Sequence, residues 1–145
     1  MEFNWQACDY IFVGDNEVDF QIPGTLGLIY NAGIWNNLKD KTRSYPLFKF
    51  DEFVTSKTKS EILNFVSATI NDIIQFSNFH PDKFRDPNCV LVFETSNEHG
   101  MAEQRRMFIE LQLNNVSLPV IIKREYSSLS EEKFQLHAST DFGAL

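Results

Sequence analysis

The sequence predicts an α+β domain, in which an antiparallel sheet of about five strands carries one long amphipathic helix on one face. Two observations lead to this fold class. Residues 58–79 repeat apolar side chains at helical spacing, whereas the segments on either side alternate or form short apolar runs, as strands do. The chain has 145 residues, a length that favours one core, so we expect residues 1–145 to form a single domain.

The predicted helix over 58–79 has a start signal, an end signal and two distinct faces. Thr58 and Glu61 have the spacing of a capping box, and Pro81 disfavours helix at the residue before it. The apolar half of the wheel, which suits packing on a sheet, contains Ile62, Leu63, Phe65, Val66, Thr69, Ile70, Ile73, Ile74 and Phe76. The polar half contains Ser60, Asn64, Ser67, Asn71, Gln75 and Asn78.

The predicted strands lie on both sides of this helix. Residues 8–22 predict a β-hairpin around the turn Gly14–Asp15–Asn16–Glu17. After the helix, we expect strands at 89–93, 106–113, 118–122 and, at the end, 134–136; Pro119 favours an edge or a strand start for the third of these. Residues 23–46 are apolar but contain several glycines, and the sequence leaves open whether they form strand, helix or loop.

Charge and composition restrict the functional classes. The 13 basic and 20 acidic residues give a net charge of −7, which argues against binding nucleic acid or an anionic membrane but permits a basic protein partner. No signal peptide and no apolar stretch of about 20 residues is apparent, so we expect a cytoplasmic protein. The two cysteines lack a metal-ligand spacing and no phosphate-binding loop is present, so no cofactor is predicted.

The acidic residues of the predicted hairpin are candidates for binding a partner. Asp15, Glu17 and Asp19 share one parity and would project together, in a segment (residues 1–38) that has no Lys or Arg. Such a cluster would steer a basic partner, with Tyr30 and Trp35 as exposed aromatic anchors. The structural alternative is a solvated face whose charges protect an edge strand from aggregation.

The polar face of the predicted helix is a second candidate surface. Asn64, Asn71 and Gln75 form a stripe of amides where Glu and Lys are more usual on exposed helices. Amide side chains are adaptable hydrogen-bond partners, so this stripe would suit contact with another protein. Ordinary sequence variation explains it equally simply.

Two sets of residues keep an enzymatic alternative open. Glu94, Glu98 and His99 stand together in a short polar turn that would suit a small hydrolase. Asp86, Glu110 and Lys123 would suit nuclease-like, metal-assisted chemistry. Neither set has a recognised spacing, so we expect a protein that is not an enzyme; a homo-oligomeric accessory domain is a further alternative.

In size, acidity, aromatic content and lack of catalytic motifs, the chain is similar to small acidic immunity or inhibitor proteins. This resemblance implies a non-enzymatic module for protein–protein interaction that neutralises a basic toxin or nuclease. It rests on general character and on no motif, so it assigns no role to any single residue.

Overall fold

The computed structural model describes residues 8–19, 21–22, 24–79, 86–126 and 130–143. From β2 onward the chain alternates strands and helices, and its strands form one sheet in the order β1-β2-β3-β4-β5-β6, each parallel to its neighbours. The strands are β1 (Tyr10–Gly14), β2 (Gly27–Asn31), β3 (Ser44–Lys49), β4 (Asn64–Ala68), β5 (Cys89–Glu94) and β6 (Val120–Lys123). The helices are α1 (Ala32–Asn37), α2 (Phe50–Thr55), α3 (Ile70–Phe79), α4 (Gly100–Leu113) and α5 (Glu131–Gly143).

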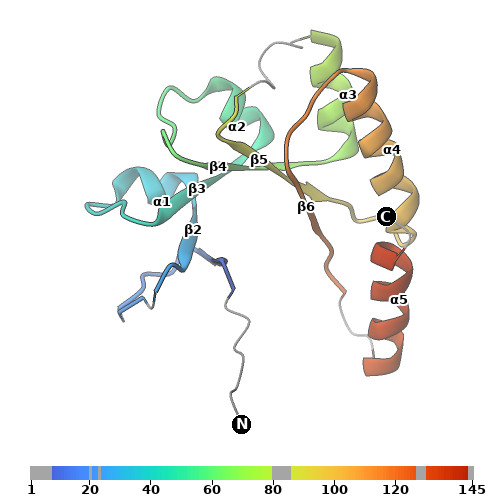
Figure 1. Cartoon of the computed structure of the whole chain (residues 1–145), viewed down its shortest axis with the longest axis horizontal. Coiled ribbons are helices and arrows are strands. Elements are labelled where there is room, and N and C mark those ends of the chain that lie inside the picture. Colours follow the sequence, from blue (N-terminus) through green and yellow to red (C-terminus); the bar gives the residue numbers. More distant parts are fainter. Residues whose placement is uncertain (1–7, 20, 23, 80–85, 127–129, 144–145) are drawn as a thin grey trace.

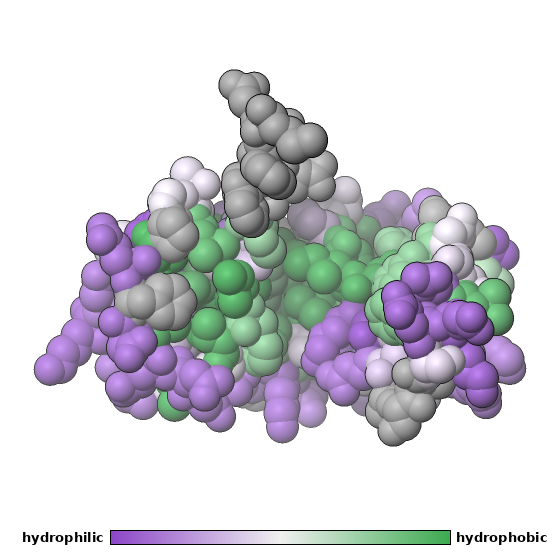
Figure 2. Space-filling view, turned by 90° about the horizontal axis from the view of Figure 1, so that it is seen from below, coloured by the Kyte–Doolittle hydropathy of each residue, from purple (hydrophilic) through white to green (hydrophobic). Residues whose placement is uncertain are grey.

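The sheet is curled, and the helices lie along its outer, convex side (Figure 1). This follows from the strand order. Successive parallel strands need crossover connections of one hand, and an order without a reversal places every crossover on the same face. The other face is concave, and hydrophobic residues gather on it when the molecule is seen from below (Figure 2).

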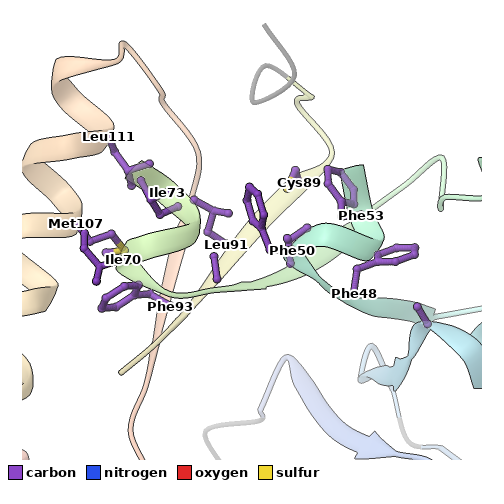
Figure 3. Close-up of a cluster of buried hydrophobic side chains, with 13 residues drawn as sticks. Phe48, Phe50, Phe53, Ile70, Ile73, Cys89, Leu91, Phe93, Met107 and Leu111 are labelled. Carbon is purple, nitrogen blue, oxygen red and sulfur yellow. The ribbon is translucent and has the colours of Figure 1, made fainter. Parts of the chain in front are cut away.

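The main core lies between the sheet and the helices. Phe48, Val66 and Leu91 occupy one level of β3, β4 and β5, since Phe48 is paired with Val66 and Val66 with Leu91. All three are fully buried, and they pack with side chains of α2, α3 and α4 (Figure 3). A smaller second cluster joins Leu28, Tyr30 and Trp35, from β2 and α1.

Three aromatic rings line the concave face near β1. Tyr10, Tyr45 and Phe65 meet edge to face, with ring centroids 5.4–6.5 Å apart. Gly27 lies beneath the two tyrosines, where an added Cβ would stand 2.7 Å from the Tyr10 ring and 3.0 Å from the Tyr45 ring. A residue without a side chain is therefore needed at this position.

The predicted fold class, an antiparallel sheet with one long helix, is wrong. Residues 8–22 form no hairpin: β1 ends at Gly14, which has a φ of 62°, and β1 pairs in parallel with β2. Residues 15–19 after it belong to no strand. The turn residues that begin at Gly14 end strand β1, but they do not connect it to an antiparallel neighbour.

The predicted helix over 58–79 is also wrong in its first half. Residues 64–68 are the buried strand β4, and only α3 is helical. The helix is capped from Thr69, whose backbone N–H and hydroxyl both donate to the Asp72 carboxylate at 2.7 Å. Strand β4 runs almost directly into α3, so the two together form one continuous apolar run in the sequence. The Thr58–Glu61 pair has the spacing of a capping box and was therefore mistaken for the start of the helix.

The remaining predictions divide in two. The strands predicted at 89–93 and 118–122 are confirmed as β5 and β6, and Pro119 directly precedes the edge strand β6. The strands predicted at 106–113 and 134–136 lie instead in α4 and α5. The undecided segment 23–46 contains β2, α1 and the start of β3. Within the described residues, no helix combines the length and apolar character that a membrane span requires.

Candidate functional site

A pocket of about 590 Å³ lies at the carboxyl ends of β4, β5 and β6. In a parallel sheet these ends lie side by side at one end of the strands: Thr69 follows β4, Glu94 ends β5 and Lys123 ends β6. The lining residues are Thr69, Glu94, Thr95, Ser96, Asn97, Glu98, Lys123, Arg124, Glu125, Tyr126 and His137. Sheets of parallel strands bind ligands at the carboxyl ends of their strands, so this pocket is the best candidate site.

Lys123 is held between two carboxylates on one side of the pocket. Its Nζ lies 3.1 Å from Glu94 Oε1, across the β5–β6 pair, and 3.1 Å from Glu125 Oε1. The hydrogen bond to Glu125, followed by that to Glu94, raises the pKa of Lys123 above its ordinary value. The ammonium group therefore stays charged and already shares its charge with two partners.

The loop between β5 and α4 is ordered by a carboxylate from the first turn of α4. Glu103 accepts hydrogen bonds from the Thr95 hydroxyl and, at 3.4 Å, from Asn97 Nδ2. The Thr95 hydroxyl in turn accepts from the backbone N–H of Asn97 at 3.1 Å. A carboxylate is also favourable at a helix N-terminus, so Glu103 stabilises both the start of α4 and the conformation of the loop before it.

Arg124 lines the pocket, and its side chain is almost completely enclosed. Its side chain is 5% exposed, and its Nε donates to Asp141 Oδ2 at 2.7 Å. Nη1 and Nη2 donate to the backbone oxygens of Thr95 and Glu98 at 2.8 and 3.4 Å. Its guanidinium thus joins β6 to the β5–α4 loop and to α5.

Asp141 is the buried member of this network. It is the α5 carboxylate, 3% exposed, and accepts a second hydrogen bond from the Tyr126 hydroxyl at 2.7 Å. Burial and the hydrogen bond to Asp141 raise the pKa of Tyr126 above 10.0. A buried carboxylate is tolerated when it is paired in this way.

The pocket offers hydroxyl, amide and carboxylate groups, and its two lining cations are already occupied. Three carboxylates, those of Glu94, Glu98 and Glu125, line the pocket together with Lys123 and Arg124. Within the described ranges, no group of three or more His, Cys, Asp or Glu side chains is arranged to hold a metal ion. The lining therefore suits a hydroxylated or neutral polar ligand better than a polyanion.

The structure divides the residues of the predicted catalytic alternatives. Glu94 and Glu98 line the pocket, whereas His99 is exposed at the N-cap of α4 and does not line it. The histidine in the pocket is His137, which sequence reasoning missed because it assigned its neighbours to a strand. The second set is dispersed: Asp86 precedes β5, Lys123 ends β6, and Glu110 forms an ion pair with Arg106 on α4.

The predicted acidic partner-binding residues are exposed but lie away from the pocket. Asp15, Glu17 and Asp19 follow β1, the opposite edge strand of the sheet from β6. Asp15 Oδ1 accepts a hydrogen bond from Asn31 Nδ2 at 2.8 Å. The three carboxylates are available to solvent, and their binding of a partner stays a prediction.

The predicted aromatic anchors and amide stripe have different positions from those expected. Tyr30 and Trp35 are buried in the second cluster, and Trp35 Nε1 donates to the Ser44 carbonyl at 2.9 Å. Asn64 is buried on β4, where its side chain bonds to the backbone of Ser60. Of the three amides, Asn71 and Gln75 are exposed on α3, so the three share no stripe.

The chain is similar to three proteins named 4-hydroxy-3-methylbut-2-en-1-yl diphosphate synthase (flavodoxin). It is 26% identical to that of Parabacteroides distasonis over 145 residues, which cover 99% of this chain and 23% of the relative. Proteins of two Bacteroides fragilis strains are 24% identical over 141 residues, covering 94% of the chain and 21% of each relative. The chain thus spans roughly a fifth of its relatives' length. No protein-family model matches it, and neither does any solved structure.

These relatives correct the functional prediction. They are named as an enzyme, so the expectation of a non-enzymatic immunity or inhibitor protein is wrong, and so is the expectation of a protein that is not an enzyme. Size, acidity and aromatic content are shared by many unrelated proteins, and the parallel α/β sheet differs from the antiparallel fold that accompanied that prediction.

Proposed function

We propose that this chain is an α/β domain of an enzyme related to the 4-hydroxy-3-methylbut-2-en-1-yl diphosphate synthases. The observation that carries the proposal is the asymmetry of the match, which covers 99% of this chain but 23% of the Parabacteroides distasonis relative. A match of this kind is expected when one protein corresponds to a single domain of a larger one. The chain then contributes one folded unit to the larger enzyme's activity.

Within such an enzyme, the domain has a supporting role. Recognition of a diphosphate needs unpaired cations or a cluster of backbone N–H groups. In the pocket described above, Lys123 is shared by two carboxylates and Arg124 is bonded to Asp141 and two carbonyls. We therefore assign diphosphate binding to other parts of the larger enzyme, and structural support to this domain.

A domain exchange tests the proposal. The segment of the Parabacteroides distasonis synthase that aligns with this chain is replaced by the chain, and formation of 4-hydroxy-3-methylbut-2-en-1-yl diphosphate is measured by mass spectrometry. We expect the exchanged enzyme to form product, while an enzyme carrying a glycine–serine linker in place of the segment does not. A folded but inactive exchanged enzyme would contradict the proposal.

The isolated chain provides the complementary measurement. Its assigned role is supporting, so we expect the purified chain to yield no product in the same assay. Product formation by the isolated chain would show that the pocket performs the chemistry itself.

The acidic segment after β1 supports a further part of the proposal, a contact with a basic protein surface. Asp15, Glu17 and Asp19 are all exposed, and the net charge of −7 disfavours nucleic acid and anionic membranes. Self-association stays a prediction, which light scattering of the purified chain tests. We also infer a cytoplasmic location, because Cys8 and Cys89 are both free thiols.

A further inference from the structure

We propose that α5 is a separately opening wall of the pocket, held closed by the Arg124–Asp141–Tyr126 network. Opening would expose the pocket without unfolding the sheet. The inference rests on the packing of α5 and not on the proposed enzymatic role.

The first step is how little apolar surface α5 buries. Phe134, Leu136 and Phe142 are all exposed, and among the described side chains of the helix only Asp141 is buried. A surface helix ordinarily docks through an apolar stripe. Here a carboxylate occupies the buried position, so docking depends on hydrogen bonds and charge.

The second step is that Arg124, the residue to which α5 binds, is held in place by partners outside α5. Arg124 is bonded to the carbonyls of Thr95 and Glu98, and it packs against Gly100 where a Cβ would come within 2.6 Å of Cζ. When Asp141 withdraws, the guanidinium keeps these two partners. The sheet and α4 therefore lose little when α5 leaves.

The third step links the helix to the pocket. His137 of α5 and Tyr126 line it together, with their ring centroids 6.2 Å apart, and Tyr126 also meets Phe134 edge to face at 5.5 Å. Undocking of α5 removes His137 from the lining and uncovers one face of Tyr126. The position of Asp141 thus determines whether the pocket has a wall on this side.

Amide hydrogen exchange of the full chain tests the proposal directly. In the wild-type protein, we expect the amides of α5 to exchange faster than those of β4 and β5, through an opening that exposes little surface and depends weakly on denaturant. Exchange of α5 only together with the whole domain would overturn the proposal. This measurement needs no substitution, so it decides the matter even where a variant fails to fold.

Two variants sharpen the test. Asp141→Asn removes the charge at constant shape, and we expect it to raise α5 exchange about tenfold or more, as loss of a charge-assisted hydrogen bond does. Tyr126→Phe, which removes one hydrogen bond, should have a smaller effect in the same direction. The matched control Glu132→Gln neutralises an exposed carboxylate in the first turn of α5, where it interacts with the helix dipole, so it should raise exchange far less than Asp141→Asn, by about fivefold at most. A folded Asp141→Asn variant with wild-type exchange in α5 would refute the network's role.

A chemical probe reports on the pocket itself. In a Cys8→Ser background, His137→Cys places a thiol in the pocket wall, and its alkylation rate measures opening. We expect Asp141→Asn to accelerate alkylation at position 137 far more than Glu132→Gln does. Buried Cys89 is an internal reference, and its reaction at the same rate would mean that the whole domain unfolds, which would overturn the proposal.

Discussion

Gly100 and the guanidinium of Arg124 share one small space at the start of α4. A Cβ at Gly100 would stand 2.6 Å from Cζ and 2.8 Å from Nε, atoms that Asp141 and Thr95 hold in place. We expect Gly100→Ala to lower the free energy of unfolding by about 1–3 kcal/mol, the usual cost of overpacking a buried position. Urea denaturation of the wild type and the variant measures this loss of unfolding free energy.

The matched control is Gly33→Ala in α1. An added Cβ at Gly33 meets no atom within 4 Å, and alanine favours a helix over glycine by about 0.5–1 kcal/mol. This variant should therefore be at least as stable as the wild type. Equal stability of the two alanine variants would show that Arg124 moves aside without cost.

The two cysteines are expected to react very differently. Burial is the main cause that raises the pKa of Cys89 to about 12, whereas Cys8 is exposed. Alkylation follows the thiolate fraction and access, so near pH 8 a mass shift for one label should appear quickly at Cys8. Cys89 should react only after denaturation. Rapid double labelling of the native protein would contradict the placement of Cys89 in the core.

At the scale of single elements, β4 and α3 show which local signals the sequence carried. Thr69 and Asp72 have capping-box spacing, as Thr58 and Glu61 do, and only the hydrogen bonds in the structure separate the true start from the false one. Apolar runs with turn residues on both sides, as in β5 and β6, were predictable. In α4, Met107 and Leu111 face the core, while Ile109 and Leu113 are exposed. These four residues alternate with others along the sequence, and this alternation led to the wrong prediction of a strand.

The docking of α5 should depend on pH through Tyr126. Burial and the bond to Asp141 raise its folded-state pKa above 10.0, while the unfolded phenol loses its proton near that value. The stability that Tyr126 contributes is therefore fully present below about pH 10 and is lost as the pH rises through the higher folded-state pKa.

Comparison of two proteins isolates this contribution. Burial also raises the pKa of Tyr10 and Tyr30, so the wild type should lose stability in alkali for more than one reason. Urea denaturation between about pH 9 and pH 11 should show a smaller loss for Tyr126→Phe than for the wild type. Parallel curves for the two proteins would exclude Tyr126 as a source of the pH dependence.

At the scale of the whole molecule, the centre and the edge of the sheet should differ in their contribution to stability. Phe48 is completely buried between the sheet and the helices, whereas Phe12 on β1 is 55% exposed. Phe48→Ala should cost about 3–5 kcal/mol of unfolding free energy in urea denaturation. The same substitution at Phe12 should cost much less, and equal losses would contradict the assignment of the main core.

The arrangement of the sheet was beyond the reach of local patterns. An apolar run such as 89–93 predicts a buried strand, but the same letters fit a parallel or an antiparallel neighbour. What decides is the helix between two strands, and α1 and α4, which lie between strands, were not recognised as helices in the sequence. The pocket depended on the same step, because its residues come together only when β5 and β6 are parallel. Glu94, Glu98 and Lys123 were identified as candidates, whereas Arg124, Tyr126 and His137 in the lining, and Asp141 behind it, were not.

The unreversed strand order has a consequence for how the chain acquires its structure. Every strand pairs with its neighbours along the chain, so each addition closes only the loop formed by one connection, which contains a helix from β2 onward. Short loops cost less entropy to close, and contacts between near neighbours speed folding. We therefore expect assembly to proceed stepwise from β1 towards β6 while the ribosome is still extending the chain, each new unit using the previous strand as its template.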